Sequence, residues 1–334
     1  MLLPSLRCTQ PLRSVYRLAL SVAPLAGRRD IQMMASQNGI NERAQTGFAK
    51  SAAYDQYRPG YSPTATEKLL GQCRVSGLKN AKVLDLAAGT GKFTEALVSR
   101  GEHYEVIAVE PHDGMREVLE KKQLPRVSVL NGKANSIPLE DDSVDAIVVA
   151  QAFHWFATKE TLRELHRVLK PHGALGLIWN IEDYNAPRGH EAATPWEGKV
   201  QDLTWTFKDD EPRFRHEQWR KVFEEQSKST PLSLIVANEQ YFALPLGEHQ
   251  EPFVKWLPKE KVWERYNTIS HISVLQGEER ERTYKTFMDA INGPDVETND
   301  NGEVAVHGNT YTIWATKIPE DGRASLTHVE MPDA

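Results

Sequence analysis

The sequence predicts an α/β fold, built on a doubly wound and mostly parallel sheet with helices on both faces. Two patterns between residues 80 and 180 carry this prediction. Short runs of Val, Ile, Leu and Ala occur without polar alternation, which is typical of strands buried on both faces. Amphipathic helical stretches separate these runs, and such alternation is typical of parallel sheets with right-handed crossovers.

The first strand of the predicted sheet leads into a turn of small residues, VLDLAAGTGKFT at positions 83–94. Gly89 and Gly91 allow a tight turn with close approach of the backbone, and the helix after it presents free amide groups to a ligand. A dinucleotide site would have a third glycine where this chain has Thr94, and the carboxylate of Asp85 would repel a pyrophosphate. The turn therefore favours another cofactor that contains adenosine.

The second strand, at 104–110, ends in an acidic residue, Glu110. It follows the turn at the distance of about 20 residues from which an acid binds both hydroxyls of a ribose. The alternative is a solvated carboxylate at a strand end. A third strand at 127–131 and a fourth at 143–150 continue the pattern, with an exposed acidic turn before the fourth.

Positions 83–94 resemble motif I of the class I S-adenosylmethionine-dependent methyltransferases, in which an acid at the strand end precedes a glycine-rich turn around the amino-acid half of the cofactor. The resemblance implies a Rossmann-like, seven-stranded sheet with an antiparallel edge pair, and S-adenosyl-L-methionine as the cofactor. It also implies a set of cofactor-binding residues, for which the matching positions are Asp85, Ala87, Gly89, Gly91, Glu110, Pro111, Met115, Ala134, Asn135 and Gln151. Two positions depart from the family pattern, because Ala87 replaces its usual first glycine and Lys133 replaces an acid that often meets the adenine. We therefore expect the adenine contact from the Ala134 backbone or the Asn135 side chain.

The fourth strand is followed by QAFHWF at 151–156, at the edge where open α/β sheets bind ligands. This block is similar to one in a small-molecule branch that includes trans-aconitate methyltransferase-like proteins. His154 is the candidate catalytic residue, because an imidazole can take a proton from a hydroxyl or amine acceptor near neutral pH. The alternative is a hydrogen-bonded wall residue among aromatic rings. Phe153 and Trp155 are candidates to line the substrate pocket.

Upstream, the segment 48–61 is dense in Tyr and ends in a Pro-Gly-Tyr turn. It resembles the corresponding segment of the same branch, which implies a lid that excludes water from the cofactor. Tyr57 and Arg58 are candidates to bind the cofactor or a substrate carboxylate, and Tyr54 is a candidate for the pocket. The alternative is a collar that packs the first helix on the sheet.

The rest of the chain predicts a cap and the completion of the sheet. A helix at 161–170 and a fifth strand at 174–180 precede a helical cap insertion, in which Trp219 is a further candidate for the substrate pocket. The later elements expected are a strand at 232–236, helices at 253–266 and 278–291, and a hairpin at 304–318 with turns at Gly302 and Gly308. The resulting domains are 1–35, a targeting or unstructured segment; 45–182, the cofactor-binding core; 183–230, the helical cap; 231–318, completion of sheet and cap; and 319–334, a tail.

The first 35 residues have the composition of an address segment. Five arginines and no acidic residue precede Asp30. This composition favours a mitochondrial transit peptide. Two alternatives are a short signal-peptide core at 18–26 and a cytoplasmic protein whose translation starts at Met33 or Met34.

The composition argues against several classes of function. Lys and Arg number 40 against 46 Asp and Glu, a net charge of −6, so no overall basic field exists to collect nucleic-acid phosphates. The sequence also lacks the Asn/Asp-Pro-Pro-aromatic motif of methyltransferases that act on base or amide nitrogens. Two cysteines without clustered histidines predict neither a disulfide scaffold nor a metal site. No apolar run reaches the roughly 18 residues that a membrane span needs.

We therefore expect methyl transfer from S-adenosyl-L-methionine to a small-molecule acceptor, either a carboxylic acid or a hydroxyl compound. A carboxylate is ionised already and needs no base, whereas a hydroxyl would require His154. One alternative is a catalytically inert subunit that binds the cofactor, which Ala87 and Lys133 support. The other is a NAD(P)-dependent oxidoreductase, against which Asp85 and Thr94 argue.

Overall fold

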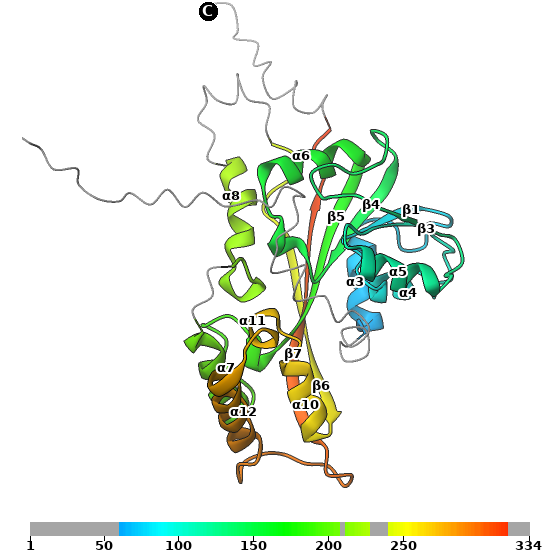
Figure 1. Cartoon of the computed structure of the whole chain (residues 1–334). Coiled ribbons are helices and arrows are strands. Elements are labelled where there is room, and N and C mark those ends of the chain that lie inside the picture. The colour runs from blue at the N-terminus through cyan, green and yellow to red at the C-terminus, as the bar shows by residue number, and fades with distance from the viewer. Residues whose placement is uncertain (1–59, 208–210, 228–239, 320–334) are drawn as a thin grey trace, which may run out of the picture. The chain divides into compact units, whose positions relative to one another are not determined.

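The computed structural model describes residues 60–207, 211–227 and 240–319, which belong to one compact unit, 35–334. Among these residues, seven strands form a single sheet in the order β3-β2-β1-β4-β5-β7-β6 (Figure 1). Pairing is parallel from β3 through β5, and β7 is antiparallel to both β5 and β6. The strands are β1 (Lys82–Leu86), β2 (Glu105–Val109), β3 (Val127–Leu130), β4 (Val144–Ala150), β5 (Leu169–Glu182), β6 (Gly247–Leu257) and β7 (Val304–Thr316). The predicted doubly wound sheet with an antiparallel edge pair is confirmed.

The helices alternate with the parallel strands and then gather into a second group. The α-helices are α3 (Pro63–Gln72), α4 (Lys92–Val98), α5 (Asp113–Lys121), α6 (Lys159–Val168), α7 (Pro195–Thr206), α8 (Lys221–Ser227), α10 (Lys259–Tyr266), α11 (Ser270–Ser273) and α12 (Gly277–Ile291). Short 3-10 helices are η1 (Phe153–Trp155), η2 (Asp183–Asn185), η3 (Phe214–His216) and η4 (Gln218–Arg220). In Figure 1, α7, α10, α11 and α12 lie around the ends of β6 and β7 that are distant from α6.

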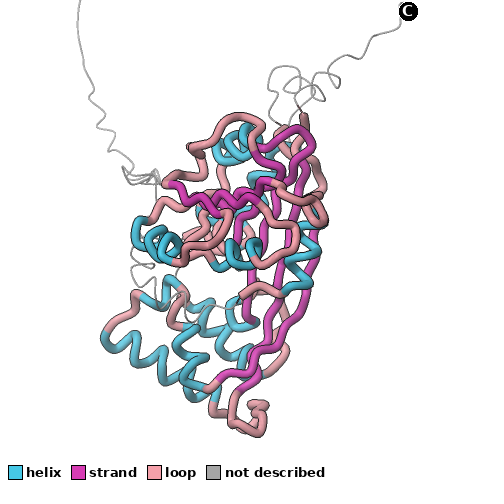
Figure 2. Tube along the Cα trace, turned by 90° about the vertical axis from the view of Figure 1, so that its right-hand side faces the viewer, coloured by secondary structure: helices cyan, strands magenta, loops and turns pink. Residues whose placement is uncertain are grey.

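Side chains on the two faces of the sheet form two separate cores. Alternate residues of β1 show the division, because Leu84 and Leu86 belong to one cluster and Val83 to the other. The first cluster packs against α6, η4 and α8, and the second against α3 and α4. A third cluster unites α7, α10, α11 and α12 with the first residues of β7. Figure 2 shows the long strands running from the parallel part of the sheet to these helices.

The hairpin predicted at 304–318 is wrong, because these residues form one strand, β7, as far as Thr316. Gly308 makes no turn there. A Cβ at this position would lie 2.5 Å from the carbonyl oxygen of Ile181 and 2.6 Å from the ring of Phe253. The glycine therefore permits close packing of neighbouring strands, which is a second use of glycine within a sheet.

The helix predicted at 253–266 begins later than expected. α10 starts at Lys259, and the preceding residues belong to the edge strand β6. β7 supplies an antiparallel partner for every residue of β6, and Pro252 is tolerated because one side of an edge strand needs no donor. The helix predicted at 278–291 is confirmed as α12, and the one predicted at 161–170 as α6, which ends at Val168 because Leu169 and Lys170 already belong to β5. The strand predicted at 232–236 lies outside the described residues.

Candidate cofactor and acceptor site

Four strand ends bring the predicted cofactor residues to one edge of the sheet. β1, β2, β3 and β4 are parallel neighbours, so their carboxyl ends lie together. The turn 87–91 follows β1, Glu110 follows β2, the turn 133–136 follows β3, and Gln151 follows β4. The strand order reverses between β1 and β4, which is the position where open α/β sheets form a ligand crevice.

The turn after β1 has a left-handed backbone at three positions. The angle φ is 58° at Ala87, 59° at Gly89 and 88° at Gly91. A Cβ on Gly91 would overlap Leu119 of α5, so this position requires glycine. Ala87 adopts a left-handed conformation despite its side chain, at a cost of about 1–2 kcal/mol. Its methyl group therefore does not prevent the turn.

Asp85 is buried in β1 and connects this strand to α4. Its Oδ2 accepts a hydrogen bond of 2.6 Å from the Thr94 hydroxyl. Its Oδ1 is buried and has no hydrogen-bond partner among the described residues. Burial raises the pKa of Asp85 to about 7, while the bond from Thr94 opposes this increase and nearby Glu110 adds to it. An orphaned carboxylate oxygen at this edge fits a cationic group of a ligand, such as the ammonium of S-adenosylmethionine.

Glu110 is buried directly after β2, where both of its carboxylate oxygens meet backbone amides. Gly89 N donates to Oε2 and His112 N donates to Oε1, each at 2.8 Å. Burial raises the pKa of Glu110, and these two hydrogen bonds oppose the increase. Each oxygen keeps a second lone pair for a hydroxyl group. Glu110 and the glycine turn therefore form one hydrogen-bonded unit, in which the acid is already oriented.

The other predicted adenine contacts lie beside this unit. Met115 is buried in α5 next to the glycine turn, and Pro111 is half-buried ahead of that helix. Ala134 and Asn135 form the corner of the tight turn 133–136, where Ala134 is half-buried and Asn135 is exposed. The structure thus brings these residues to the same edge from α5 and from the end of β3.

Gln151 connects the end of β4 with β5 and with the start of the described chain. Its side-chain amide donates to the carbonyl oxygen of Asn180 at 2.9 Å. The side chain of Asn180 donates to Gly60 O at 3.2 Å and accepts from the Thr310 hydroxyl at 2.8 Å. Next to this anchor, Tyr61 packs edge-on against an aromatic ring of α4, with centroids 5.1 Å apart. The buried Asn180 therefore fixes the last residues of the segment 48–61, which is predicted to form the lid.

His154 lies in η1, directly after the end of β4. Its Nδ1 accepts a hydrogen bond of 3.2 Å from Trp179 Nε1. The His154 ring centroid lies 5.4 Å from that of Trp155 and 6.4 Å from that of Trp179. The buried guanidinium of Arg213, just before η3, lies 4.5 Å from the centre of the Trp155 ring. The segment predicted to form the cap therefore places a cation, Arg213, against Trp155.

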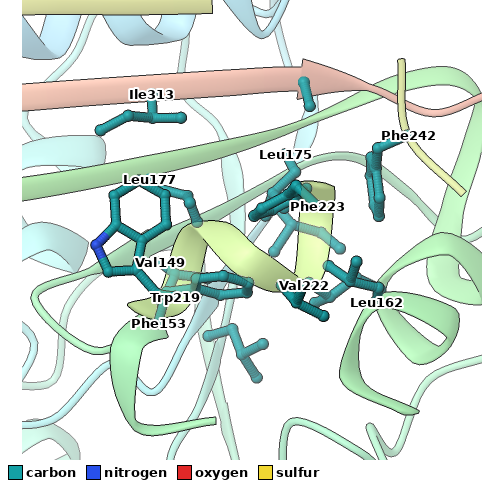
Figure 3. Close-up of a cluster of buried hydrophobic side chains, with 14 of the residues drawn as sticks. Val149, Phe153, Leu162, Leu175, Leu177, Trp219, Val222, Phe223, Phe242 and Ile313 are labelled. Atoms are coloured by element: carbon teal, nitrogen blue, oxygen red, sulfur yellow. The ribbon is translucent and has the colours of Figure 1, made fainter. Parts of the chain in front are cut away.

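Phe153 and Trp219, both predicted for the substrate pocket, lie in the first hydrophobic core (Figure 3). The Phe153 ring centroid is 5.5 Å from that of Phe223 and 6.5 Å from that of Trp219. Both predicted side chains are buried within this core. Trp155 is half-buried at the edge and is the pocket candidate that these neighbours leave partly exposed.

Three predicted residues, Tyr54, Tyr57 and Arg58, lie outside the described residues. Two functional contacts escape the sequence patterns. In the sequence, Thr94 only marks the absence of the third glycine of a dinucleotide site, and Trp179 is only one residue of a predicted strand. Neither pattern predicts the hydrogen bond to Asp85 or to His154. Within the described ranges, no group of three or more His, Cys, Asp and Glu side chains is arranged to hold a metal ion. Nor does the same part of the chain contain a helix long and apolar enough to cross a membrane.

The fold is that of an α/β protein in which the glycine turn and two buried acids, Asp85 and Glu110, lie together at the carboxyl edge of the parallel strands. A family model described as a methyltransferase domain matches residues 84–177. A methyltransferase-like protein of Schizosaccharomyces pombe, itself uncharacterized, is 34% identical over 233 residues, which are 70% of this chain and 80% of that protein. A demethylmenaquinone methyltransferase of Thermotoga maritima is 39% identical over 98 residues, 29% of this chain and 42% of that protein. Two further curated relatives are matched over about half of their own length, 53% and 50%.

The chain belongs to the class I S-adenosylmethionine-dependent methyltransferases. A solved structure from Anaeromyxobacter dehalogenans, whose name proposes a type II methyltransferase, matches with a TM-score of 0.50 and 17% identity. The match covers 79% of this chain and 100% of that one. At this level of identity the likeness concerns the fold alone.

Proposed function

We propose that this protein binds S-adenosyl-L-methionine at the edge formed by β1, β2, β3 and β4. It transfers the methyl group to a small-molecule acceptor, a carboxylic acid or a hydroxyl compound. The observation that carries the proposal is the pair of buried acids, Asp85 and Glu110, on the two sides of one glycine turn. When bound, the cofactor supplies a methyl group that its sulfonium has already activated. The chain has to bind and orient the cofactor and the acceptor, and it has to exclude water from them.

Each acid has a separate role in this proposal. Oδ1 of Asp85 binds the ammonium of the cofactor, because it is the buried oxygen that the fold leaves without a partner. Glu110 binds the ribose hydroxyls with the lone pairs that its two amide bonds leave available. The turn 133–136 and Met115 lie on the adenine side. Tyr57 and Arg58 join the site on the basis of the family resemblance alone.

Three observations support a small acceptor. The net charge of −6 gives the chain no overall attraction for a polyanion. The acceptor side of the edge is also covered by the cap, since Arg213 contacts Trp155. One relative is named for demethylmenaquinone, which is itself a small molecule. We place the acceptor beside His154, Trp155 and Arg213.

The test is a calorimetric titration of the full chain with S-adenosyl-L-methionine, its demethylated product and NAD. The variant is Asp85→Ala with Glu110→Ala. The matched control is Glu105→Ala with Asp113→Ala, which removes two exposed acids from the same region. We expect S-adenosyl-L-methionine and its demethylated product to bind with micromolar affinity. Loss of this binding in the Asp85→Ala, Glu110→Ala variant, but not in the control, supports the cofactor site. Binding of NAD alone would overturn the proposal.

Turnover separates an enzyme from an inert cofactor-binding subunit. A panel of small carboxylic acids and hydroxyl compounds would be incubated with S-adenosyl-L-methionine and the protein, and the demethylated product measured. Product formation above that of the double variant supports the enzyme. Tight cofactor binding without product from any acceptor would favour the inert subunit.

A further inference from the structure

The contact between Trp179 and His154 determines which nitrogen of the imidazole carries a proton. The indole nitrogen of Trp179 can only donate a hydrogen bond, so Nδ1 of His154 must accept it. A neutral imidazole that accepts at Nδ1 carries its proton at Nε2. We propose that His154 acts as a hydrogen-bond donor through Nε2–H, held in this tautomer by Trp179, and that it removes no proton from the acceptor. This proposal rests on the proposed function and assigns the role of one residue within it.

A general base at this position would need the opposite arrangement. To accept a proton at Nε2, the neutral imidazole would have to carry its own proton at Nδ1. The charged imidazole that results from proton transfer would carry protons at both nitrogens. In both forms an N–H group of His154 would face the N–H group of Trp179. The buried indole would then lose its acceptor, at a cost of about 1–3 kcal/mol.

Trp179 cannot easily turn away from His154. Its side chain is completely buried in β5, between strands β4 and β7. Its ring centroid lies 5.0 Å from that of Phe214 and 5.0 Å from that of Trp219. These two residues come from η3 and η4 of the cap region. Trp179 is therefore a positioning residue, which acts on the reaction only through the imidazole.

The donor role limits the acceptors that the site can use. Because no side chain removes a proton, the attacking oxygen must already be ionised at neutral pH, and among oxygen acids a carboxylate meets this condition. In the transfer, a lone pair of the acceptor oxygen forms the bond to the methyl carbon. The bond between that carbon and sulfur breaks, and its electron pair remains on the sulfur, which becomes a neutral thioether. The products are a methyl ester and the demethylated cofactor, and no proton has to leave.

The Nε2–H group and Arg213 suit such an acceptor. An imidazole N–H donates one hydrogen bond to a carboxylate oxygen, which orients the other oxygen toward the methyl group. Arg213 contributes positive charge on the same wall, because its guanidinium lies over Trp155, whose ring in turn neighbours His154. The cation would favour an anionic acceptor over a neutral one.

The tautomer can be measured without any turnover. The full chain would be labelled with [15N]histidine, and two-bond 1H–15N correlation spectra recorded at pH 7.5. Because the chain has 11 histidines, His154→Gln would assign the resonances of interest. We expect a protonated Nε2 and an unprotonated, hydrogen-bonded Nδ1. In Trp179→Phe, which removes the indole N–H, we expect the fraction protonated at Nδ1 to rise.

A wild-type His154 protonated at Nδ1, or protonated at both nitrogens, would overturn the proposal. The wild-type spectrum decides this even if Trp179→Phe does not fold. In the acceptor screen, His154→Gln keeps an N–H donor and should retain turnover within about tenfold, whereas His154→Leu should lose more. Equal loss in both variants, by the 10²–10⁴-fold typical of a missing base, would contradict the donor role. Failure of every acceptor would count against the proposed function and leave the tautomer measurement intact.

Discussion

Asp85 illustrates, at the scale of a single residue, how a binding group lowers the stability of the fold. The pKa of its carboxyl group is about 7 in the folded state and ordinarily 3.8. Between these two pH values the folded state holds a proton that the unfolded chain has released. Stability therefore falls as the pH rises from about 4 to about 7. At pH values above this window, ionisation of the buried carboxyl group lowers the stability by at most about 4 kcal/mol.

Asp85→Asn should remove this dependence. The amide does not ionise, and its oxygen can still accept the hydrogen bond from Thr94. We expect the variant to be more stable than the wild type at pH 8, with the difference shrinking toward pH 4, while its affinity for S-adenosyl-L-methionine falls. Urea unfolding at pH 4, 6 and 8 measures the first effect, and Asp300→Asn serves as the exposed control. A difference in stability that is the same at all three pH values would contradict the pKa of about 7.

Glu110 leads to a prediction about binding rather than stability. Glu110→Gln replaces one carboxylate oxygen with an NH₂ group, which would face either the Gly89 or the His112 amide. We expect the affinity for S-adenosyl-L-methionine to fall about 10- to 100-fold, the range for lost hydrogen bonds to a charged group. Calorimetry would give the Kd. Glu105→Gln, on the exposed start of the same strand, should leave it unchanged, and a Glu110→Gln protein with wild-type affinity would remove Glu110 from the site.

At the scale of elements, the sequence predicts the parallel strands well because each is a short apolar run with no alternation. The pattern fails at β6 and β7 for a physical reason. A glycine that permits close strand packing, such as Gly308, looks the same in sequence as one that makes a turn. Similarly, the acids at the ends of β1 and β2 can be predicted from their spacing. The bond between Asn180 and Gly60 cannot, because it joins positions 120 residues apart.

Asn180 gives the prediction at this scale, since it joins β5, β7 and the chain that enters at Gly60. Asn180→Asp keeps the acceptor for Thr310 but replaces the donor to Gly60 with an oxygen that repels its carbonyl. Thr310→Val removes only the other bond. Both variants should lose about 1–3 kcal/mol of stability. Only Asn180→Asp should also weaken cofactor binding, because Gly60 belongs to the segment 48–61 that is predicted to form the lid. Equal cofactor affinities, measured by calorimetry, would show that Asn180 has a purely structural role.

At the scale of the whole molecule, the three hydrophobic clusters lie in two parts of the fold. Two of them lie on the two faces of the parallel sheet and support the cofactor edge directly. The third lies among α7, α10, α11 and α12 and meets the sheet at the start of β7. Because the third cluster shares few elements with the other two, we expect the helices around it to open separately while the cofactor edge remains folded.

Phe287→Ala tests this division. Phe287 is fully buried in α12, with its ring centroid 4.9 Å from that of Tyr266 and 5.2 Å from that of Trp263. Its truncation should cost about 3–5 kcal/mol within the third cluster. Hydrogen exchange followed by mass spectrometry should then show faster exchange in α7, α10 and α12 and unchanged protection in β1, β2 and β4. Phe93→Ala, in the cluster beneath α4, should give the opposite pattern and also weaken cofactor binding. Uniformly faster exchange in both variants would mean that the sheet and the third cluster unfold as one cooperative unit, and that α7, α10 and α12 could not open without the cofactor edge.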